Sequence, residues 1–310
     1  MRMRRTGLAA AVLALALTVA ACGSDGGSTA NSGGEQKQIT IGAFNFPESE
    51  IMANIYAGLL TKAGYKTTVK SLGAREIVEP ALEKGEIDLV PEYLGTFTEF
   101  LNVKINGKDA KPLANGNVDQ TLAAAQKIAA ERGLVVLPPA AAQDQNAFAV
   151  TKDFSESNKV TTLSQLGALT GTPLVLGGPP ECPQRPFCRP GLEKTYGITF
   201  TGFKAYQKFP LIKQALKSGD IQLGLVFSSD SGNAANNLVV LEDDKGLQTV
   251  DNLTPVVRAA SASEALKSAL AQINDELTTE VLTGLNNKVE NERQTPSNVA
   301  KAWLQQVNLG

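Results

Sequence analysis

The sequence predicts an α/β fold of two lobes joined by two crossovers of the chain. Helix-like and strand-like segments alternate along most of it, which is typical of α/β proteins. One short segment also occurs twice, as ALEKGEIDLVPEYLGT at 81–96 and ALKSGDIQLGLVFSSD at 215–230, with matching positions 134 residues apart. The 310 residues are enough for two cores of ordinary size. We therefore expect two lobes of similar build.

Each copy of the repeat contains the end of a helix, a glycine turn and a short apolar strand. Gly85 and Gly219 mark the turns, because glycine accepts the left-handed backbone that often ends a helix. Tyr93 and Phe227 end the two strands. Ligands of open α/β sheets bind beyond the carboxyl ends of strands. Each lobe is therefore expected to present one aromatic ring to a shared cleft, the alternative being a coincidence between two ordinary helix-to-strand joints.

The first 21 residues are typical of an export signal. Three arginines precede the apolar run Leu8–Ala21, which is too short to span a membrane. Residues 19–22, Val-Ala-Ala-Cys, match the bacterial lipobox, and this signature implies cleavage before Cys22 and lipidation of that cysteine. Residues 22–37 are rich in Gly, Ser and Asn and predict a flexible tether. A plain secretory signal with an incidental cysteine is the alternative.

The charge balance argues against a nucleic-acid partner. Without the three arginines of the signal, 26 of the 29 basic residues remain against 31 acidic ones, a net charge of −5. No other apolar run is long enough to cross a bilayer, so the body is expected to be soluble. We also expect no cofactor and no metal site, because the acidic run at 242–244 lacks ligand spacing.

Two cysteines follow Cys22, at Cys182 and Cys188. An even number in an exported chain indicates one disulfide, which would close the loop CPQRPFC. The spacing is not that of a CxxC redox motif, so a structural bond is favoured over redox catalysis.

The first lobe begins with an apolar strand at 39–46, and Pro47 with the acids after it opens a helix that Gly64 ends. A second strand, 66–71, and a helix from Gly73 lead to the first repeat. Strand, helix, strand, helix, strand is the pattern of a parallel α/β lobe. The segments that follow are a helix through 100–101, a polar loop at 106–117, an alanine-rich helix at 118–132 and a strand at 134–137.

The second lobe is expected at 143–248, inserted between the two parts of the first lobe at 38–142 and 249–310. Its expected segments are strands at 147–150, 174–176 and 238–241, helices at 162–166 and 191–196, and the second repeat. The segment Pro-Val-Val at 255–257 returns the chain to the first lobe, and three amphipathic helices close it, with Trp303 in the core. Two crossovers form a hinge, and hinged lobes close over a ligand.

Several motifs together resemble one family, the substrate-binding proteins of osmoprotectant ABC importers, which take up glycine betaine, choline, carnitine or proline betaine. They are ITIG-x-x-NF, GEIDLVPEYLGT, PPE…RP…GLEKTYG, VVLEDDKG and TPVVR, and the resemblance covers nearly all of 38–304. It implies the two-lobed type II periplasmic-binding-protein fold. It also implies a small solute as ligand, the transmembrane subunits of an ABC permease as partner, and a monomer lipid-anchored on the extracytoplasmic face of the cell membrane.

The resemblance also implies a ligand site. In this family a cage of tyrosines holds the quaternary ammonium, which cannot donate hydrogen bonds and is attracted by ring faces. By position, Tyr93 matches one cage tyrosine, and Phe227 stands where a second is expected. Thr96 matches a hydroxyl at a helix amino terminus, a place suited to anions. Asp144 matches an acid at the cleft, and Arg185 matches the arginine that grips the ligand carboxylate.

Three positions depart from the family pattern. Asn146 and Asp251 stand where cage tyrosines are usual, and Phe44 stands where many members have lysine. Of the four cage aromatics only Tyr93 and Phe227 remain, so a full cage is not available from these positions. At about 0.5–2 kcal/mol per cation–π contact, two lost rings weaken betaine binding about tenfold to a few hundredfold. Asp144 and Asp251 could offset part of this loss by attracting a cation directly. Asn146 and Asp251 equally suit a hydroxylated or amide ligand.

The sequence leaves alternatives for single residues and for the function. Arg185 could pin its own loop through a surface ion pair, Thr96 could only cap a helix, and Phe227 could belong to the core of its lobe. An enzyme on the same fold is disfavoured because the chain has no histidine, although Asp144 or Asp251 could act as a base. A binding protein or sensor for another small polar or aromatic solute is the third possibility.

Overall fold

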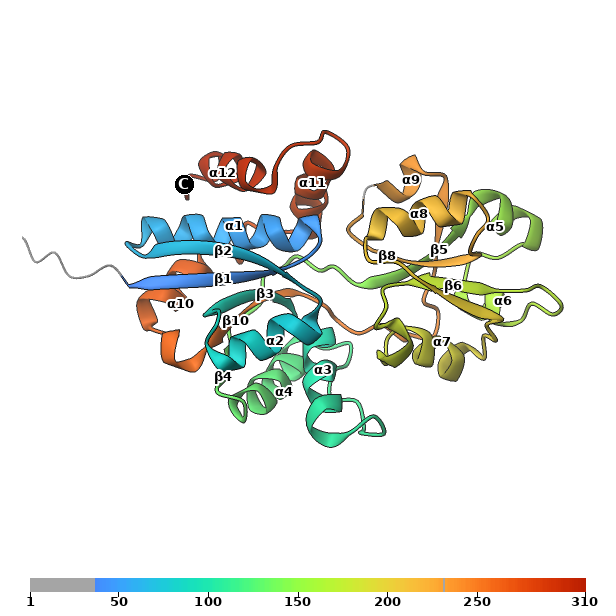
Figure 1. Ribbon diagram of the computed structural model, residues 1–310, viewed down its shortest axis with the longest axis horizontal. Helices are drawn as coiled ribbons and strands as arrows, with labels where there is room; N and C mark the ends of the chain where they lie inside the picture. The colour runs from blue at the N-terminus through green and yellow to red at the C-terminus, as the bar shows by residue number, and fades with distance from the viewer. Residues whose placement is uncertain (1–36, 231) are drawn as a thin grey trace, which may run out of the picture. The chain divides into compact units, whose positions relative to one another are not determined.

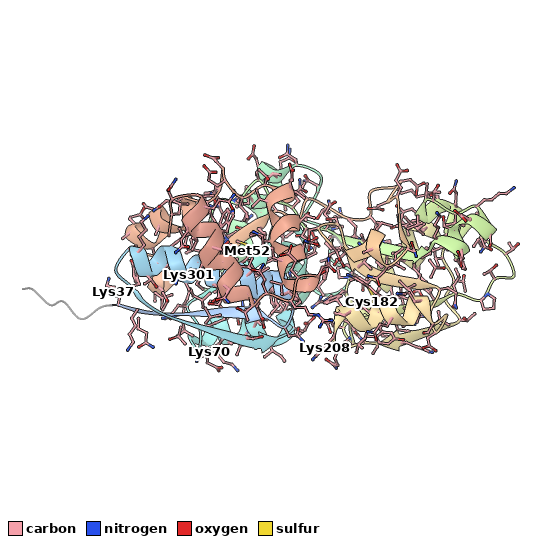
Figure 2. The ribbon with its side chains drawn as sticks, turned by 90° about the horizontal axis from the view of Figure 1, so that it is seen from above. Lys37, Met52, Lys70, Cys182, Lys208 and Lys301 are labelled. Atoms are coloured by element: carbon pink, nitrogen blue, oxygen red, sulfur yellow. A yellow bond between two sulfur atoms is a disulfide. The ribbon has the colours of Figure 1, made fainter. Side chains whose placement is uncertain are left out.

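A computed structural model describes residues 37–230 and 232–310. The predicted signal peptide, the lipidation site Cys22 and the tether up to residue 36 lie outside the described residues. Figure 2 marks Lys37, where the described chain begins. Among the described residues, no helix combines the length and the apolar character that a membrane crossing requires.

The first lobe is the part of the chain that packs around a five-stranded sheet. Its first stretch contains β1 Gln38–Phe44, α1 Pro47–Lys62, β2 Lys66–Gly73, α2 Arg75–Lys84, β3 Leu89–Tyr93, α3 Leu94–Asn106, α4 Val118–Ala130 and β4 Leu134–Val136. Its second stretch contains β10 Leu253–Arg258, a short 3-10 turn at Ala259–Ser261, α10 Glu264–Ala271, α11 Thr279–Glu290 and α12 Pro296–Gln306. The three closing helices confirm the prediction, and Trp303 on α12 is buried.

The second lobe packs around a second five-stranded sheet. It contains β5 Asn146–Thr151, α5 Lys152–Asn158, α6 Leu163–Gly167, β6 Val175–Gly178, a 3-10 turn at Cys182–Gln184, α7 Arg189–Tyr196, β7 Gly202–Ala205, α8 Phe209–Lys217, β8 Leu223–Phe227, α9 Gly232–Ala235 and β9 Leu238–Leu241. Three of these elements, α5, β7 and α9, are short and were not expected from the sequence. In Figure 1, helices cover both faces of each sheet, with α1 and α2 on opposite faces of the first sheet and α8 and α7 on opposite faces of the second.

The two sheets have the same plan. Their strand orders are β2-β1-β3-β10-β4 and β7-β6-β8-β5-β9. In each sheet the first three strands of this order are parallel, as predicted for the first lobe, whereas β10 and β5 pair antiparallel with both neighbours. The antiparallel strand is in each case the one that directly follows a crossover between the lobes. The predicted α/β class with two lobes and two crossovers is therefore confirmed.

The two crossovers pair with each other. Gln143 and Asn252 form an isolated antiparallel bridge. Beside it, the backbone nitrogen of Asp144 donates to the carbonyl of Asp251 at 3.1 Å, and that of Leu253 donates to the carbonyl of Ala142 at 3.0 Å. These bonds join both strands of the hinge into one ribbon. The boundaries proposed for the lobes, at 142/143 and 248/249, stay a prediction.

The sequence repeat is a structural repeat. Gly85 and Gly219 both have φ +77°, the left-handed conformation. After each glycine, the nitrogens at the next two positions donate to one helix carbonyl, of Ala81 in the first copy and of Ala215 in the second. The strands that follow, β3 and β8, have bounds 134 residues apart and end at Tyr93 and Phe227. The same helix, glycine turn and strand thus occur in both lobes, and both strands end toward the space between the lobes.

Candidate functional site

A cavity of about 450 Å³ lies between the lobes. All eight residues that the sequence analysis proposed as ligand contacts line it, namely Phe44, Tyr93, Thr96, Asp144, Asn146, Arg185, Phe227 and Asp251. The strand ends explain this convergence, because β3 and β8 deliver Tyr93 and Phe227, and Asn146 at the start of β5 pairs with Phe227 in the second sheet. Their roles as ligand contacts stay a proposal.

Aromatic rings from both lobes meet at this cavity. Phe46 lies among them, with its ring centroid 5.8 Å from Phe44 and 6.2 Å from Tyr93 in the first lobe. Across the cleft, Phe46 stacks on Phe227 at 5.6 Å and meets Phe209 edge-on at 6.0 Å. Phe209 and Phe227 are themselves 4.4 Å apart. We call these five residues the aromatic wall.

The aromatic wall changes the expectation of an incomplete cage. Only Tyr93 and Phe227 were expected as cage rings from the sequence, and neither Phe46 nor Phe209 was expected in the site. The sequence did contain a sign of both residues. Phe46 ends the motif ITIG-x-x-NF, and Phe209 lies 134 positions after Arg75, the offset of the repeat, and Arg75 also lines the cavity. Phe227 is half-buried and faces these rings, so it is not confined to the core of its lobe.

A buried carboxyl group ties Tyr93 to both lobes. The hydroxyl of Tyr93 donates to Glu48 Oε1 at 2.7 Å, and Ser229 Oγ of the second lobe donates to Glu48 Oε2 at 2.8 Å. Asn286 Nδ2 on α11 also donates to Glu48 Oε2. Burial raises the pKa of Glu48 and raises the pKa of Tyr93 well above its usual range, so Tyr93 is a neutral phenol. Glu48 was not among the site residues expected from the sequence.

Asp144 lies in the crossover beside this network. Its Oδ1 accepts from the backbone nitrogen of Ser229 at 2.9 Å and from Ser228 Oγ at 3.3 Å. Burial, and then the nearby charge of Glu48, raise the pKa of Asp144 well above its usual range. Asp144 therefore holds the second lobe to the hinge and resists ionisation.

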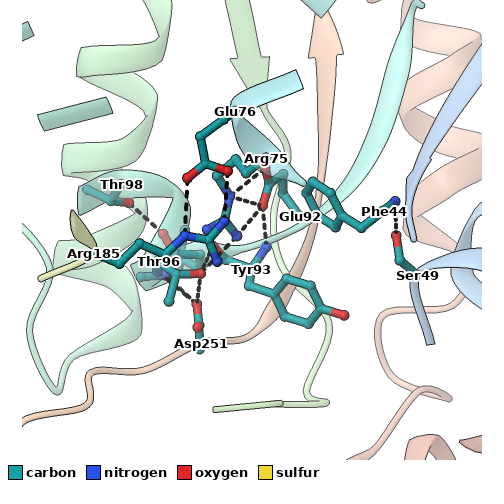
Figure 3. Close-up of polar contacts among 12 residues, drawn as sticks. Phe44, Ser49, Arg75, Glu76, Glu92, Tyr93, Thr96, Thr98, Arg185 and Asp251 are labelled. Atoms are coloured by element: carbon teal, nitrogen blue, oxygen red, sulfur yellow. Dashed lines mark hydrogen bonds and ion pairs between the residues drawn. The ribbon is translucent and has the colours of Figure 1, made fainter. Parts of the chain in front are cut away.

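Asp251 caps the amino terminus of α3. Its Oδ1 accepts from the backbone nitrogens of Gly95 at 2.9 Å and Thr96 at 3.0 Å, and from Thr96 Oγ1 at 3.3 Å (Figure 3). Burial raises the pKa of Asp251 to about 7, against the opposing effect of these donors. The expectation that Thr96 and this helix end would receive an anion is met by the chain's own carboxyl group, and Thr96 is part of the cap.

Two arginines at the cavity are held by acids. Arg75 forms a two-pronged pair with Glu92, Nε to Oε1 at 2.9 Å and Nη2 to Oε2 at 2.8 Å, and its guanidinium lies 5.5 Å from the centroid of Phe44. Arg185 forms a similar pair with Glu76 of the first lobe, at 3.2 and 3.0 Å (Figure 3), and an ion pair with Glu181 at 3.1 Å. Arg185, expected to grip a ligand, thus bridges the two lobes instead of only pinning its own loop.

The predicted disulfide is present. Cys182 and Cys188 are bonded and both are buried, and both line the cavity. Figure 2 places Cys182 in the second lobe. The bond closes the loop that carries Arg185 and so fixes where that side chain starts.

The described residues contain no group of three or more His, Cys, Asp or Glu side chains able to hold a metal ion. What the cavity offers is aromatic surface, one phenol and an excess of carboxyl groups. Such a lining suits the capture of a small molecule by ring faces and charge.

Comparisons with known proteins agree with this geometry. Residues 37–306 match the family described as the substrate binding domain of ABC-type glycine betaine transport systems. The glycine betaine-binding protein YehZ of Escherichia coli is 28% identical over 280 residues, 86% of this chain and 90% of that protein. The glycine-betaine-binding protein of Pseudomonas aeruginosa is 27% identical over 292 residues, 89% of each chain.

A solved structure described as a glycine betaine/carnitine/choline ABC transporter shares the fold. Its TM-score is 0.66 at 23% identity, covering 87% of this chain and 99% of that one. This likeness confirms the expected type II periplasmic-binding-protein fold. The chain is a substrate-binding protein and not an enzyme, and with residues 37–306 matched it belongs to the family of substrate-binding domains of ABC-type glycine betaine transport systems.

Proposed function

We propose that this protein captures a small quaternary ammonium osmoprotectant outside the cytoplasm and delivers it to the permease of an ABC importer. The aromatic wall is the observation that carries the proposal, because a trimethylammonium group has no hydrogen-bond donor and is attracted by ring faces. Phe46, Phe209 and Phe227 contribute rings from both lobes, so a solute packed against them would contact both lobes at once. The cavity of about 450 Å³ is in the range of small-molecule sites.

Calorimetric titration and thermal shift of the purified full chain test the proposal. The ligands are choline, glycine betaine, carnitine and tetramethylammonium, compared with the neutral isostere of choline in which carbon replaces the nitrogen. A ligand at a hundred times its dissociation constant stabilises by about 2.7 kcal/mol. We expect the quaternary ammonium compounds to bind and the neutral isostere to bind at least tenfold more weakly. Equal binding of choline and its isostere contradicts the proposal, as does a response to amino acids or sugars alone.

The proposed lipid anchor rests on the lipobox at 19–22. Acylation of Cys22 would hold a monomeric binding protein on the outer face of the cell membrane. Mass spectrometry of the amino-terminal peptide and fractionation of cells test this. We expect a diacylglyceryl mass on Cys22 and loss of membrane retention in C22S. A C22S protein that stays in the membrane fraction contradicts the anchor.

A further inference from the structure

The subsite at which a ligand carboxylate would bind is already filled by a side chain of the protein. The first backbone nitrogens of a helix are the usual receptor for an anion, because they have no partner within the helix. In α3 those of Gly95 and Thr96 donate to Asp251 Oδ1. Asp251 is only 3% exposed. Among the described residues its second oxygen, Oδ2, has no hydrogen-bond donor, although Asp251 lines the cavity.

Asp251 is fixed in this place by the backbone around it. A Cβ atom added to Gly95 would lie 2.2 Å from Thr249 Oγ1 and 2.3 Å from the carbonyl oxygen of Val250, so the hinge segment packs directly on the start of α3. The nitrogen of Leu94 also donates to the carbonyl of Asn252 at 3.0 Å. A ligand cannot displace the Asp251 carboxylate without moving the crossover.

The basic residues of the cavity do not offer a second binding site for a ligand carboxylate. Of the described residues, three basic side chains line the cavity, and each is paired with an acid: Arg75 with Glu92, Lys104 with Glu79 and Glu83, and Arg185 with Glu76 and Glu181. Five acidic residues line the same cavity, Glu76, Glu79, Asp144, Glu181 and Asp251. Burial raises the pKa of both Glu79 and Asp251 to about 7, so at pH 8 four of the five acids are ionised even with Asp144 protonated, against three bases. A carboxylate entering this cavity would have to break an existing ion pair, whereas a cation would relieve the excess of negative charge.

We propose that Asp251 is a specificity-determining residue, which takes the place of a ligand carboxylate and makes the pocket select cations without a carboxylate over zwitterionic betaines. The proposal rests on the proposed function, since it assumes that the aromatic wall holds a quaternary ammonium group. The bound solute would place its ammonium against the aromatic wall and toward Asp251 Oδ2, and its remaining end would be neutral, as in choline.

The test compares choline, glycine betaine and tetramethylammonium by calorimetric titration at pH 8. We expect choline to bind at least tenfold more tightly than glycine betaine. D251A, which frees the helix amino terminus, should weaken choline binding about tenfold and strengthen glycine betaine binding, so that the preference is lost. D251N, which keeps an oxygen acceptor without the charge, should weaken choline and tetramethylammonium alike. D275N removes the same charge from an exposed position away from the cavity and should change nothing.

A rescue measurement keeps the proposal testable even if D251A is unstable. Sodium formate should raise the melting temperature of D251A by binding at the vacated helix end, relative to sodium chloride at the same ionic strength. It should leave the wild-type protein unchanged.

The outcomes separate this inference from the proposed function. If tetramethylammonium and choline bind but glycine betaine binds as tightly as choline, or if D251A keeps the wild-type preference, the role of Asp251 is wrong and the proposed function stands. If no quaternary ammonium compound binds, both are wrong.

Discussion

The hydroxyl of Tyr93 is anchored to Glu48 Oε1 at 2.7 Å, and the same carboxyl group accepts from Ser229 of the other lobe. The ring of Tyr93 is therefore held at the cavity by a carboxyl group that also binds the second lobe through its other oxygen. Tyr93→Phe keeps the ring and removes one donor from a buried acceptor, so we expect it to lower the free energy of unfolding by about 1–3 kcal/mol. Its solute affinity should stay within about threefold of wild type.

Tyr93→Leu removes the ring itself. At about 0.5–2 kcal/mol for a cation–π contact, choline affinity should fall between about twofold and thirtyfold. Tyr65→Phe is the matched control for Tyr93→Phe. Tyr65 is a buried tyrosine of the same lobe, its hydroxyl pairs with Ser263, and it does not line the cavity. Calorimetric titration measures choline affinity, and urea unfolding measures the free energy of unfolding. Choline binding by Y93L that equals wild type removes Tyr93 from the site.

Phe46 is the ring that meets aromatic side chains of both lobes. Phe46→Leu keeps an apolar side chain but removes its ring face, so we expect choline affinity to fall about tenfold, within the range for lost aromatic contacts. Phe203→Leu is the control, because Phe203 is half-buried in the second lobe and does not line the cavity. If F46L and F203L bind choline equally well, the aromatic wall does not form the solute site.

The sequence predicted the strand ends well because their chemistry is local. Glycine turns after Leu82 and Leu216 and short apolar strands are readable from neighbouring residues, and the common offset of 134 places Tyr93 and Phe227 at equivalent positions. Edge strand β7 was missed because its four residues include an exposed lysine, Lys204, and carry no long apolar run.

The polar side of the cavity could not be predicted in the same way. Glu48 follows Pro47 in the first turn of α1, where an acid is ordinary because it complements the helix dipole. Its role depends on Ser229 and Asn286, which lie 181 and 238 positions away. Asp251 was assigned from the resemblance as a lost tyrosine, and its capping of α3 appears only once the crossover packs against Gly95.

Arg185 and Glu76 join the lobes at the surface, and both side chains are partly exposed. Exposed ion pairs contribute about 0–1 kcal/mol, so a double-mutant cycle of R185A and E76A should give a coupling below about 1 kcal/mol that shrinks at high salt. Choline affinity of R185A should change less than about fivefold. A hundredfold loss in R185A would mean that Arg185 binds the solute directly.

The Cys182–Cys188 bond closes a loop of seven residues that lines the cavity. The chain-entropy model gives about 2 kcal/mol for a loop of this size. The C182S/C188S double variant should therefore lower the free energy of unfolding by about this amount. Dithiothreitol should destabilise the wild-type protein similarly and leave the double variant unchanged. Equal sensitivity of both proteins to the reductant would show that the bond does not contribute.

Asp251 makes stability depend on pH in a direction that can be worked out. Burial raises its pKa from 3.8 to about 7 in the folded protein. Between about pH 4 and pH 7 the unfolded chain loses this proton while the folded protein keeps it, so the folded state binds more protons and its stability falls as pH rises. A pKa shift of about three units corresponds to a change in the free energy of unfolding of order 4 kcal/mol.

D251N carries no titrating group at this position and keeps the oxygen that accepts from Gly95 and Thr96. Its stability relative to wild type should therefore increase by a few kcal/mol between pH 4.5 and pH 7.5. Burial also raises the pKa of Glu48 and Asp144, and both groups are present in both proteins. The difference therefore reports the titration of Asp251 together with the smaller effect of its charge on the pKa of Asp144. Urea unfolding at the two pH values measures the stability of D251N relative to wild type. D275N is expected to follow wild type. Parallel pH profiles for D251N and wild type would mean that Asp251 titrates in the folded protein as it does in the unfolded chain, and that the helix cap compensates its burial.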